Sequence, residues 1–192
     1  IEARIYAEDP ERGFLPSTGR IVHLGFPSES ARIRIDTGVQ ANAEITPWFD
    51  PMIAKLVVHG STRASALARL RHALAQVEIA GVTTNVAFLR RVTASAAFDS
   101  AELDTGLIER NKGELFEKQK LKSEFLAAAA FAELAEEERA ARERPAASGD
   151  PHSPWHRVDG WRLNEESHHD FAFLEGETAH PVRLSFLDSG LR

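Results

Sequence analysis

The chain has 192 residues, of which 43% are hydrophobic, and a formal net charge of −6 at pH 7. That size and composition can bury one core or two modest ones, and they argue against wholesale disorder. Without cysteine the chain cannot form a disulfide framework, use a thiolate or bind a metal through sulfur. Lysine and arginine are scattered, which argues against a nucleic-acid surface, and no run of about 18 apolar residues predicts a membrane span.

The first residues follow a strand pattern. Residues 1–7 alternate between apolar and polar side chains, which predicts a half-buried strand. Residues 14–19 are rich in turn-forming residues, and residues 20–26 resume an extended run. Because the sequence starts within a strand, without methionine, and is neither a signal peptide nor a transit peptide, we interpret it as a segment of a longer polypeptide.

A strand at residues 31–38 and the bend after it form the centre of the first half of the chain. Alternation gives this strand an apolar face and a charged face. The charged face carries Arg32, Arg34 and Asp36. Two prolines then predict a bend over residues 47–51, before another strand at residues 52–60. A sharp bend beside fixed charges is typical of the floor of a binding site.

Two helices are predicted to pack behind these strands. Residues 60–62 offer an N-cap for the first helix, which extends to about residue 77 with apolar side chains at helical spacing. Residues 83–85 offer a second cap, for a helix over residues 86–95. Residues 98–107 read as a loop before the first unit closes. Strands come early and helices late in this unit, so its class is α+β.

The composition changes at about Asn111, and a second unit is predicted. A charged connector leads to a long helix over residues 123–144, whose apolar middle predicts burial on several sides. Residues 145–154 read as a linker. Three short strands follow, GWRLN, FAFLEG and HPVRLSFLD, and they suggest an antiparallel sheet wrapped on the helix. Since three strands cannot enclose a helix, we expect this unit to be truncated.

Sequence motifs exclude several chemistries. The glycines form neither GxGxxG nor GxxxxGK[ST], and GxSxG and HExxH are also absent. His152 and His156 have helical spacing, but Pro154 between them argues against a helical metal pair. His168 and His169 are neighbours that would face opposite ways in a strand. No metal site is therefore predicted within the chain.

Arg34 is the strongest candidate site residue, with two readings. It could be a surface arginine paired with Asp36 or Asp50, or an anion-binding guanidinium that donates two parallel hydrogen bonds to bicarbonate, a carboxylate or an enolate. Arg32 competes for this role on the same face, whereas Lys55 reads as a rim residue. Trp155 and Trp161 read as core anchors of the second unit rather than as a ligand-stacking pair.

Several blocks of the first unit resemble the C-terminal domain of biotin carboxylase. These are EARIYAEDPERGFLPSTGRI, RIDTG, FDPMIAKLVVHG and GVTTNVAFLRRV, in that order. The resemblance covers residues 1–112. It implies that Arg34 is a catalytic residue, which contacts bicarbonate and stabilises the biotin enolate, because Arg34 matches the family position by its distance to Asp50 and Lys55. A fixed cation beside a developing enolate is the expected electrostatic contribution.

The second unit resembles the linking, or BT, domain of acyl-CoA carboxylases, in which a long helix is surrounded by an antiparallel β-barrel that docks onto the carboxyltransferase subunit. The block DPHSPWHRVDGWRLN carries this resemblance. It implies a linker at residues 113–122 and a partial BT domain, a helix plus the first barrel strands, at residues 123–192. The similarity favours the methylcrotonoyl-CoA and geranyl-CoA carboxylase branch, with propionyl-CoA carboxylase as an alternative. The same block disfavours pyruvate and urea carboxylases.

The resemblance also implies cofactors and partners. The cofactors are biotin, ATP and Mg or Mn, with their sites outside this segment; the only methionine, Met52, precedes Ile53, so the Met-Lys motif that bears biotin is absent. The segment alone should therefore be inactive. Expected partners are the carboxyltransferase beta subunit, the biotin carboxyl carrier domain of the same chain and a second biotin carboxylase domain in a homodimer. The expected compartment is the bacterial cytoplasm or the mitochondrial matrix. A docking module without chemistry is the alternative function.

Overall fold

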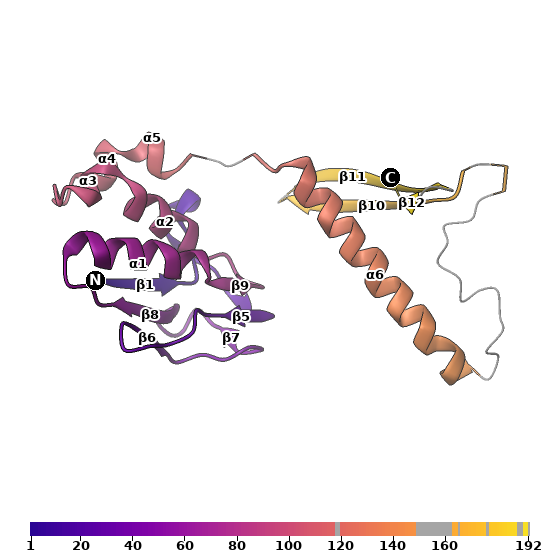
Figure 1. Ribbon diagram of the computed structural model, residues 1–192, viewed down its shortest axis with the longest axis horizontal. Helices are drawn as coiled ribbons and strands as arrows, with labels where there is room; N and C mark the ends of the chain where they lie inside the picture. The colour runs from indigo at the N-terminus through magenta and orange to yellow at the C-terminus, as the bar shows by residue number, and fades with distance from the viewer. Residues whose placement is uncertain (118–119, 149–162, 165, 176, 188–189, 192) are drawn as a thin grey trace. The chain divides into compact units, whose positions relative to one another are not determined.

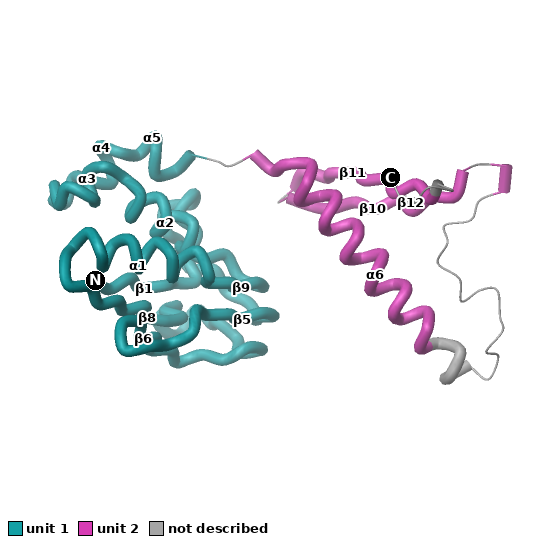
Figure 2. Tube along the Cα trace, viewed as in Figure 1, with its two compact units in different colours: residues 1–118 teal, residues 119–192 magenta. Residues whose placement is uncertain are grey.

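A computed structural model of the chain divides into two units, residues 1–118 and residues 119–192 (Figure 2). It describes residues 1–117, 120–148, 163–164, 166–175, 177–187 and 190–191. Each unit combines helices with antiparallel strands, as the sequence predicts. Among the described residues, no helix has the length and apolarity needed to cross a membrane.

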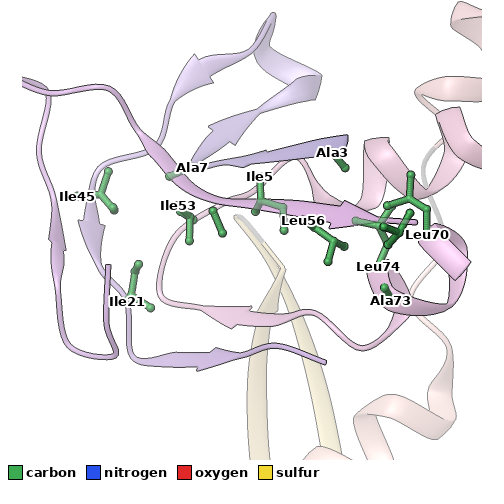
Figure 3. Close-up of a cluster of buried hydrophobic side chains, with 12 residues drawn as sticks. Ala3, Ile5, Ala7, Ile21, Ile45, Ile53, Leu56, Leu70, Ala73 and Leu74 are labelled. Carbon is green, nitrogen blue, oxygen red and sulfur yellow. The ribbon is translucent and has the colours of Figure 1, made fainter. Parts of the chain in front are cut away.

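A three-stranded antiparallel sheet is the centre of the first unit. Its order is β1 (Glu2–Tyr6), β8 (Met52–Val58) and β6 (Ile33–Thr37), so the strand after the predicted bend lies in the middle. The alternation predicted for the first strand is confirmed, because Ala3 and Ile5 are buried whereas Glu2 and Arg4 are exposed. Strands β1 and β8 supply six of the twelve buried residues in the main core of the unit (Figure 3).

Short two-stranded ladders extend the unit beyond this sheet. They pair β2 (Glu8–Asp9) with β3 (Leu15–Pro16), β4 (Gly19–Arg20) with β7 (Glu44–Ile45), and β5 (His23–Gly25) with β9 (Glu78–Ala80). A 3₁₀ turn, η1 (Pro10–Arg12), lies between β2 and β3. Strand β9 was not predicted, because its three residues are too few to show a strand periodicity that differs from the helical pattern before it.

Helix α1 (Arg63–Ala75) covers one face of the sheet (Figure 1). The predicted cap is confirmed: the Thr62 side chain accepts from the Ser65 N–H, and the Ser65 hydroxyl accepts from the Thr62 N–H, which is a capping box. The apolar stripe of the helix packs into the core. Its buried members are Ala66, Leu67, Leu70, Ala73 and Leu74.

Four shorter helices follow, α2 (Val86–Ala94), α3 (Ala96–Asp99), α4 (Leu107–Arg110) and α5 (Lys112–Leu115). The cap predicted before α2 is wrong, since Asn85 makes no side-chain cap and bonds to the backbone of β1 instead. The predicted loop over residues 98–107 contains the end of α3 and the first residue of α4. An aromatic cluster holds these helices to the β2–β3 turn. It consists of Phe14, Phe88 and Phe116.

The second unit contains α6 (Ser123–Ser148) and an antiparallel hairpin of β10 (His168–Glu175) and β11 (Thr178–Leu187), extended by β12 (Gly190–Leu191). The predicted FAFLEG and HPVRLSFLD strands lie in this hairpin. Helix α6 runs into the predicted linker, whose remainder lies outside the described residues. Of the predicted GWRLN strand, the structure describes Leu163 and Asn164, which form a turn.

Helix α6 is buried on one side, not on several as predicted. Ala130 and Leu134 pack against Leu184 of the hairpin, whereas Phe125 and Phe131 are exposed. The physical reason is that one hairpin can cover only one face of a helix. The described strands form no closed barrel around α6, so the start of a barrel stays a prediction.

Candidate functional site

The outward face of β6 and β8 brings the predicted site residues together. Arg34 lies opposite Val57, and Asp36 lies opposite Lys55, in the register of the two strands. Because side chains alternate along a strand, Arg34 and Asp36 share one face, with Lys55 beside them on the central strand. Figure 1 shows β6 and β8 next to each other in the sheet.

Arg34, Asp36 and Lys55 form an ion triad. The Arg34 Nη2 donates to Asp36 Oδ2 at 3.1 Å, and the Lys55 Nζ lies 3.5 Å from the same oxygen. The Arg34 side chain is 67% exposed, whereas those of Asp36 and Lys55 are 39% and 35% exposed. The pairing with Asp36 agrees with the surface reading of Arg34, and the exposed guanidinium also keeps donors available to an anion.

An open groove of about 600 Å³ lies beside this triad. Arg34, Arg32 and His59 line it together with Glu29. The two arginines predicted to compete for an anion therefore line the same groove. Within the described part of the chain, no ion pair or side-chain hydrogen bond engages the Arg32 guanidinium. Glu29 Oε1 accepts the backbone N–H of Ile35 at 2.9 Å, which ties a loop to the free edge of β6.

Strand β1 completes the charged face. Arg4 lies opposite Lys55 and donates its Nε to Glu2 Oε1 at 2.8 Å. The hydrogen bond from Arg4 holds the pKa of Glu2 below its usual value, with smaller contributions from the charges of Arg4 and Lys55. The face therefore carries both positive and negative groups over its three strands, with the groove at the β6 edge.

The bend predicted as the floor of a site exposes its aromatic residues. Trp48 and Phe49 are 84% and 81% exposed. Asp50 Oδ1 accepts the backbone N–H of Met52 at 3.1 Å and so fixes the start of β8. Burial, and then the charge of Asp50, raises the pKa of Glu8, a carboxylate for which no sequence pattern predicted a role.

The described residues contain no group of three or more side chains that could hold a metal ion. His168 and His169 point to opposite sides of β10, as predicted: His168 is buried beside the Glu166 carbonyl, whereas His169 Nδ1 lies 3.4 Å from Glu137 of α6. His152, His156, Trp155 and Trp161 lie outside the described residues.

Comparison with known families divides the chain at the same place as the two units. Residues 2–110 match the family described as biotin carboxylase C-terminal domain. Residues 122–191 match the family described as methylcrotonyl-CoA carboxylase, alpha-subunit, BT domain.

Curated relatives include methylcrotonoyl-CoA carboxylase subunit alpha from Dictyostelium discoideum. It is 37% identical over 191 residues, which cover 99% of this chain and 27% of the relative. The propionyl-CoA carboxylase alpha chain of Sus scrofa is 37% identical over 147 residues, which cover 74% of this chain and 20% of the relative. The chain thus spans about a quarter of the length of such relatives.

Solved structures resemble the first unit. The biotin carboxylase domain of Hydrogenobacter thermophilus 2-oxoglutarate carboxylase, a dimer in complex with MgADP, ADP and bicarbonate, is 34% identical with a TM-score of 0.59, and the match covers 62% of this chain and 26% of that one. The biotin carboxylase subunit of pyruvate carboxylase is 35% identical, also with a TM-score of 0.59, over 62% of this chain and 26% of that one.

Proposed function

Since the chain belongs to the biotin carboxylase C-terminal domain family, we propose that it is part of the biotin carboxylase subunit of an acyl-CoA carboxylase. In this role it contributes to the ATP-dependent carboxylation of biotin with bicarbonate. The single observation behind this assignment is the match of the second unit to the BT domain of the methylcrotonyl-CoA carboxylase alpha subunit. The same match favours methylcrotonoyl-CoA as the final acceptor of the carboxyl group. Propionyl-CoA and geranyl-CoA are the alternatives, and a propionyl-CoA carboxylase chain is among the relatives.

We assign the catalytic role to Arg34. Its guanidinium would bind bicarbonate and later stabilise the biotin enolate, because a fixed cation lowers the energy of negative charge that develops next to it. The groove beside Arg34 is open to such an anion. We expect the sites for Mg or Mn, for ATP and for biotin attachment in other parts of the subunit, as the family resemblance implies. The isolated chain is then inactive.

Substitution of Arg34 tests this role. In the complete subunit, Arg34→Ala should lower kcat for biotin carboxylation by about 10²–10³-fold, as for loss of one donor to an oxyanion, with little change in KM for ATP. Arg90→Ala, which removes an exposed arginine from α2, is the matched control and should retain full activity. Carboxylation by the Arg34 variant at the wild-type rate would contradict the catalytic role of Arg34.

We propose a different task for the second unit, namely docking onto the carboxyltransferase beta subunit. The match of residues 122–191 to the BT domain supports it, because the resemblance of this unit to that domain implies docking onto the carboxyltransferase subunit. Deletion of residues 121–192 from the subunit should abolish co-purification with the beta subunit and leave biotin carboxylation intact. Persistent co-purification would contradict the docking role.

The proposed organisation has a biotin carboxylase C-terminal domain at residues 1–112, a linker at 113–122 and a partial BT domain at 123–192. Further partners are the biotin carboxyl carrier domain and a second biotin carboxylase domain, as in the dimeric structural relative. We propose the mitochondrial matrix or the bacterial cytoplasm as the compartment, and relatives named as mitochondrial are consistent with the first.

A further inference from the structure

A buried amide holds strand β1 at its irregular point. The pairing of β1 with β8 shifts in register between Ile5 and Tyr6. The side chain of Asn85, a residue that is 6% exposed, bonds there to the backbone of β1 on both sides of Ile5. Its Oδ1 accepts the Tyr6 N–H at 3.0 Å, and its Nδ2 donates to the Arg4 carbonyl at 3.1 Å. The amide therefore fixes the backbone of β1 as a neighbouring strand would.

Strand β1 carries Glu2, Arg4 and Tyr6 on its outward face, because side chains alternate along a strand. The Arg4 Nε donates to Glu2 Oε1 at 2.8 Å, and Tyr6 is a second side-chain partner of the guanidinium. Both contacts raise the pKa of Arg4 above its ordinary value, and the hydrogen bond to Glu2 is the largest cause. A guanidinium has five N–H donors, more than these two contacts use, so Arg4 also has donors for a ligand of this face.

The outward face of the sheet contains charges of both signs. Lys55 of the central strand lies opposite Arg4 on one side and opposite Asp36 on the other. The negative groups on the three strands are Glu2 and Asp36, and the positive groups are Arg4, Arg34 and Lys55. So small an excess of positive charge attracts an anion only weakly at exposed positions. The positions of the donors, more than the total charge, therefore determine how well the face binds an anion.

The position of the Arg4 guanidinium depends on the backbone that carries it. Its side chain is 60% exposed, so few neighbouring atoms restrict it beyond its partners on β1. A register shift in a strand ladder changes the direction of the side chains next to it, and such irregularities are frequent beside active sites. A displacement of about 1 Å at a reacting group can lower a rate on the order of a hundredfold. Bonds that fix β1 at the shift are therefore bonds that fix Arg4.

We propose that Asn85 is a positioning residue for the carboxylation of biotin, and that it acts through the backbone of β1 on Arg4. This inference rests on the proposed biotin carboxylase function, and it does not depend on the role of Arg34. It assigns to the reaction a residue that lies at the start of α2 and is bonded to the backbone of the charged sheet.

The test uses the complete biotinylated subunit and separates rate from stability. At a temperature well below its Tm, Asn85→Ala should lower kcat for biotin carboxylation by about ten- to a hundredfold, with little change in KM for ATP. Leu115→Ala is the matched control, because Leu115 is fully buried in a separate cluster of the same unit. The control should lower Tm as well, but it should leave kcat unchanged.

A double-mutant cycle tests whether Asn85 acts through Arg4. Arg4→Ala by itself should lower kcat at least as much as Asn85→Ala does. In an Arg4→Ala background, Asn85→Ala should cause no further loss of kcat and should still lower Tm, because the bond to the Tyr6 N–H is lost there too. Asn85→Asp keeps the acceptor for the Tyr6 N–H and loses the donor to the Arg4 carbonyl, so it should also lower kcat.

The outcomes separate this inference from the proposed function. If the wild-type subunit carboxylates biotin and the Asn85 variants keep its kcat, Asn85 has a structural role alone and the proposed function stands. A wild-type kcat in Arg4→Ala, or additive losses in the double variant, would also overturn the positioning role. If the wild type has no bicarbonate-dependent activity, the proposed function fails and this inference fails with it. If Asn85→Ala does not fold, the kcat of Asn85→Asp decides.

Discussion

Asn85 is bonded to Tyr6 twice, although 79 positions separate them in the chain. The Tyr6 N–H donates to Asn85 Oδ1 at 3.0 Å, and the Asn85 N–H donates to the Tyr6 carbonyl at 3.1 Å. Asn85 Nδ2 also donates to the Arg4 carbonyl at 3.1 Å. One buried amide therefore satisfies backbone groups of β1 where the ladder with β8 is irregular, and it joins the start of α2 to the central sheet.

Asn85→Ala should destabilise the first unit by about 1–3 kcal/mol, because the Tyr6 N–H would lose its partner in a buried place. Urea denaturation, followed by a spectroscopic signal that reports on the first unit, measures this change in the free energy of unfolding. Gln40→Ala, which removes an exposed amide, should alter the free energy of unfolding by less than about 0.5 kcal/mol. Equal stability of the two variants would contradict a structural role for Asn85.

Gly81 should not tolerate a side chain. Its φ is +105°, and a Cβ there would lie 2.0 Å from the Arg20 carbonyl oxygen and 2.8 Å from the Val22 nitrogen. The backbone strain of Gly81→Ala alone is on the order of 1–3 kcal/mol, and displacement of the chain at Arg20 adds to it. Gly113→Ala is the control, since no atom lies within 4 Å of its Cβ and alanine favours helix α5. Thermal unfolding should show a large fall in Tm for the first variant and none for the second.

Glu8 should make the folded chain less stable as pH rises. Its pKa is raised from the ordinary value of 4.5 by burial and by Asp50, so the folded state binds the Glu8 proton more tightly than the unfolded state does. Stability contributed by this proton is present below the ordinary pKa and is lost as pH rises through the folded pKa. Glu8→Gln should therefore raise Tm relative to the wild type at pH 7 and not at pH values below 4.5.

Asp50→Asn should raise Tm at pH 7 by a smaller amount than Glu8→Gln, because the charge of Asp50 is the second cause of the raised pKa of Glu8. Asparagine can still accept the Met52 N–H through its side-chain oxygen. A Tm difference between Glu8→Gln and the wild type that is constant with pH would show that the effect does not come from ionisation.

Two positions on α6 should respond differently to truncation. Leu134 is 2% exposed and packs on the hairpin, so Leu134→Ala should destabilise the second unit by about 2–5 kcal/mol. Phe125 is 65% exposed, so Phe125→Ala should leave that stability nearly unchanged. Amide hydrogen exchange of β10 and β11 measures both effects. Comparable loss of protection in the two variants would mean that α6 contacts the hairpin through a different face.

Local periodicity determined much of the first unit. The two-residue period of β1 and β6 and the helical spacing of the leucines in α1 depend only on near neighbours in the chain, and the predicted burial was confirmed. The same period placed Arg34 and Asp36 on one face. Family resemblance, and not periodicity, gave Arg34 a chemical role, which stays a proposal.

Tertiary structure decided which elements meet. A strand pattern defines two faces but carries no information about the neighbouring strand, so only the register of β6 against β8 brings Lys55 to Asp36. The cap residues before α2 look like any helix start, and the position of β1 gave Asn85 a different partner. An apolar helix likewise does not reveal how many partners cover it, and in the described structure one hairpin covers α6. The direction of a side chain is thus a local property of the sequence, whereas the residue that it contacts on a neighbouring element depends on how distant segments pack.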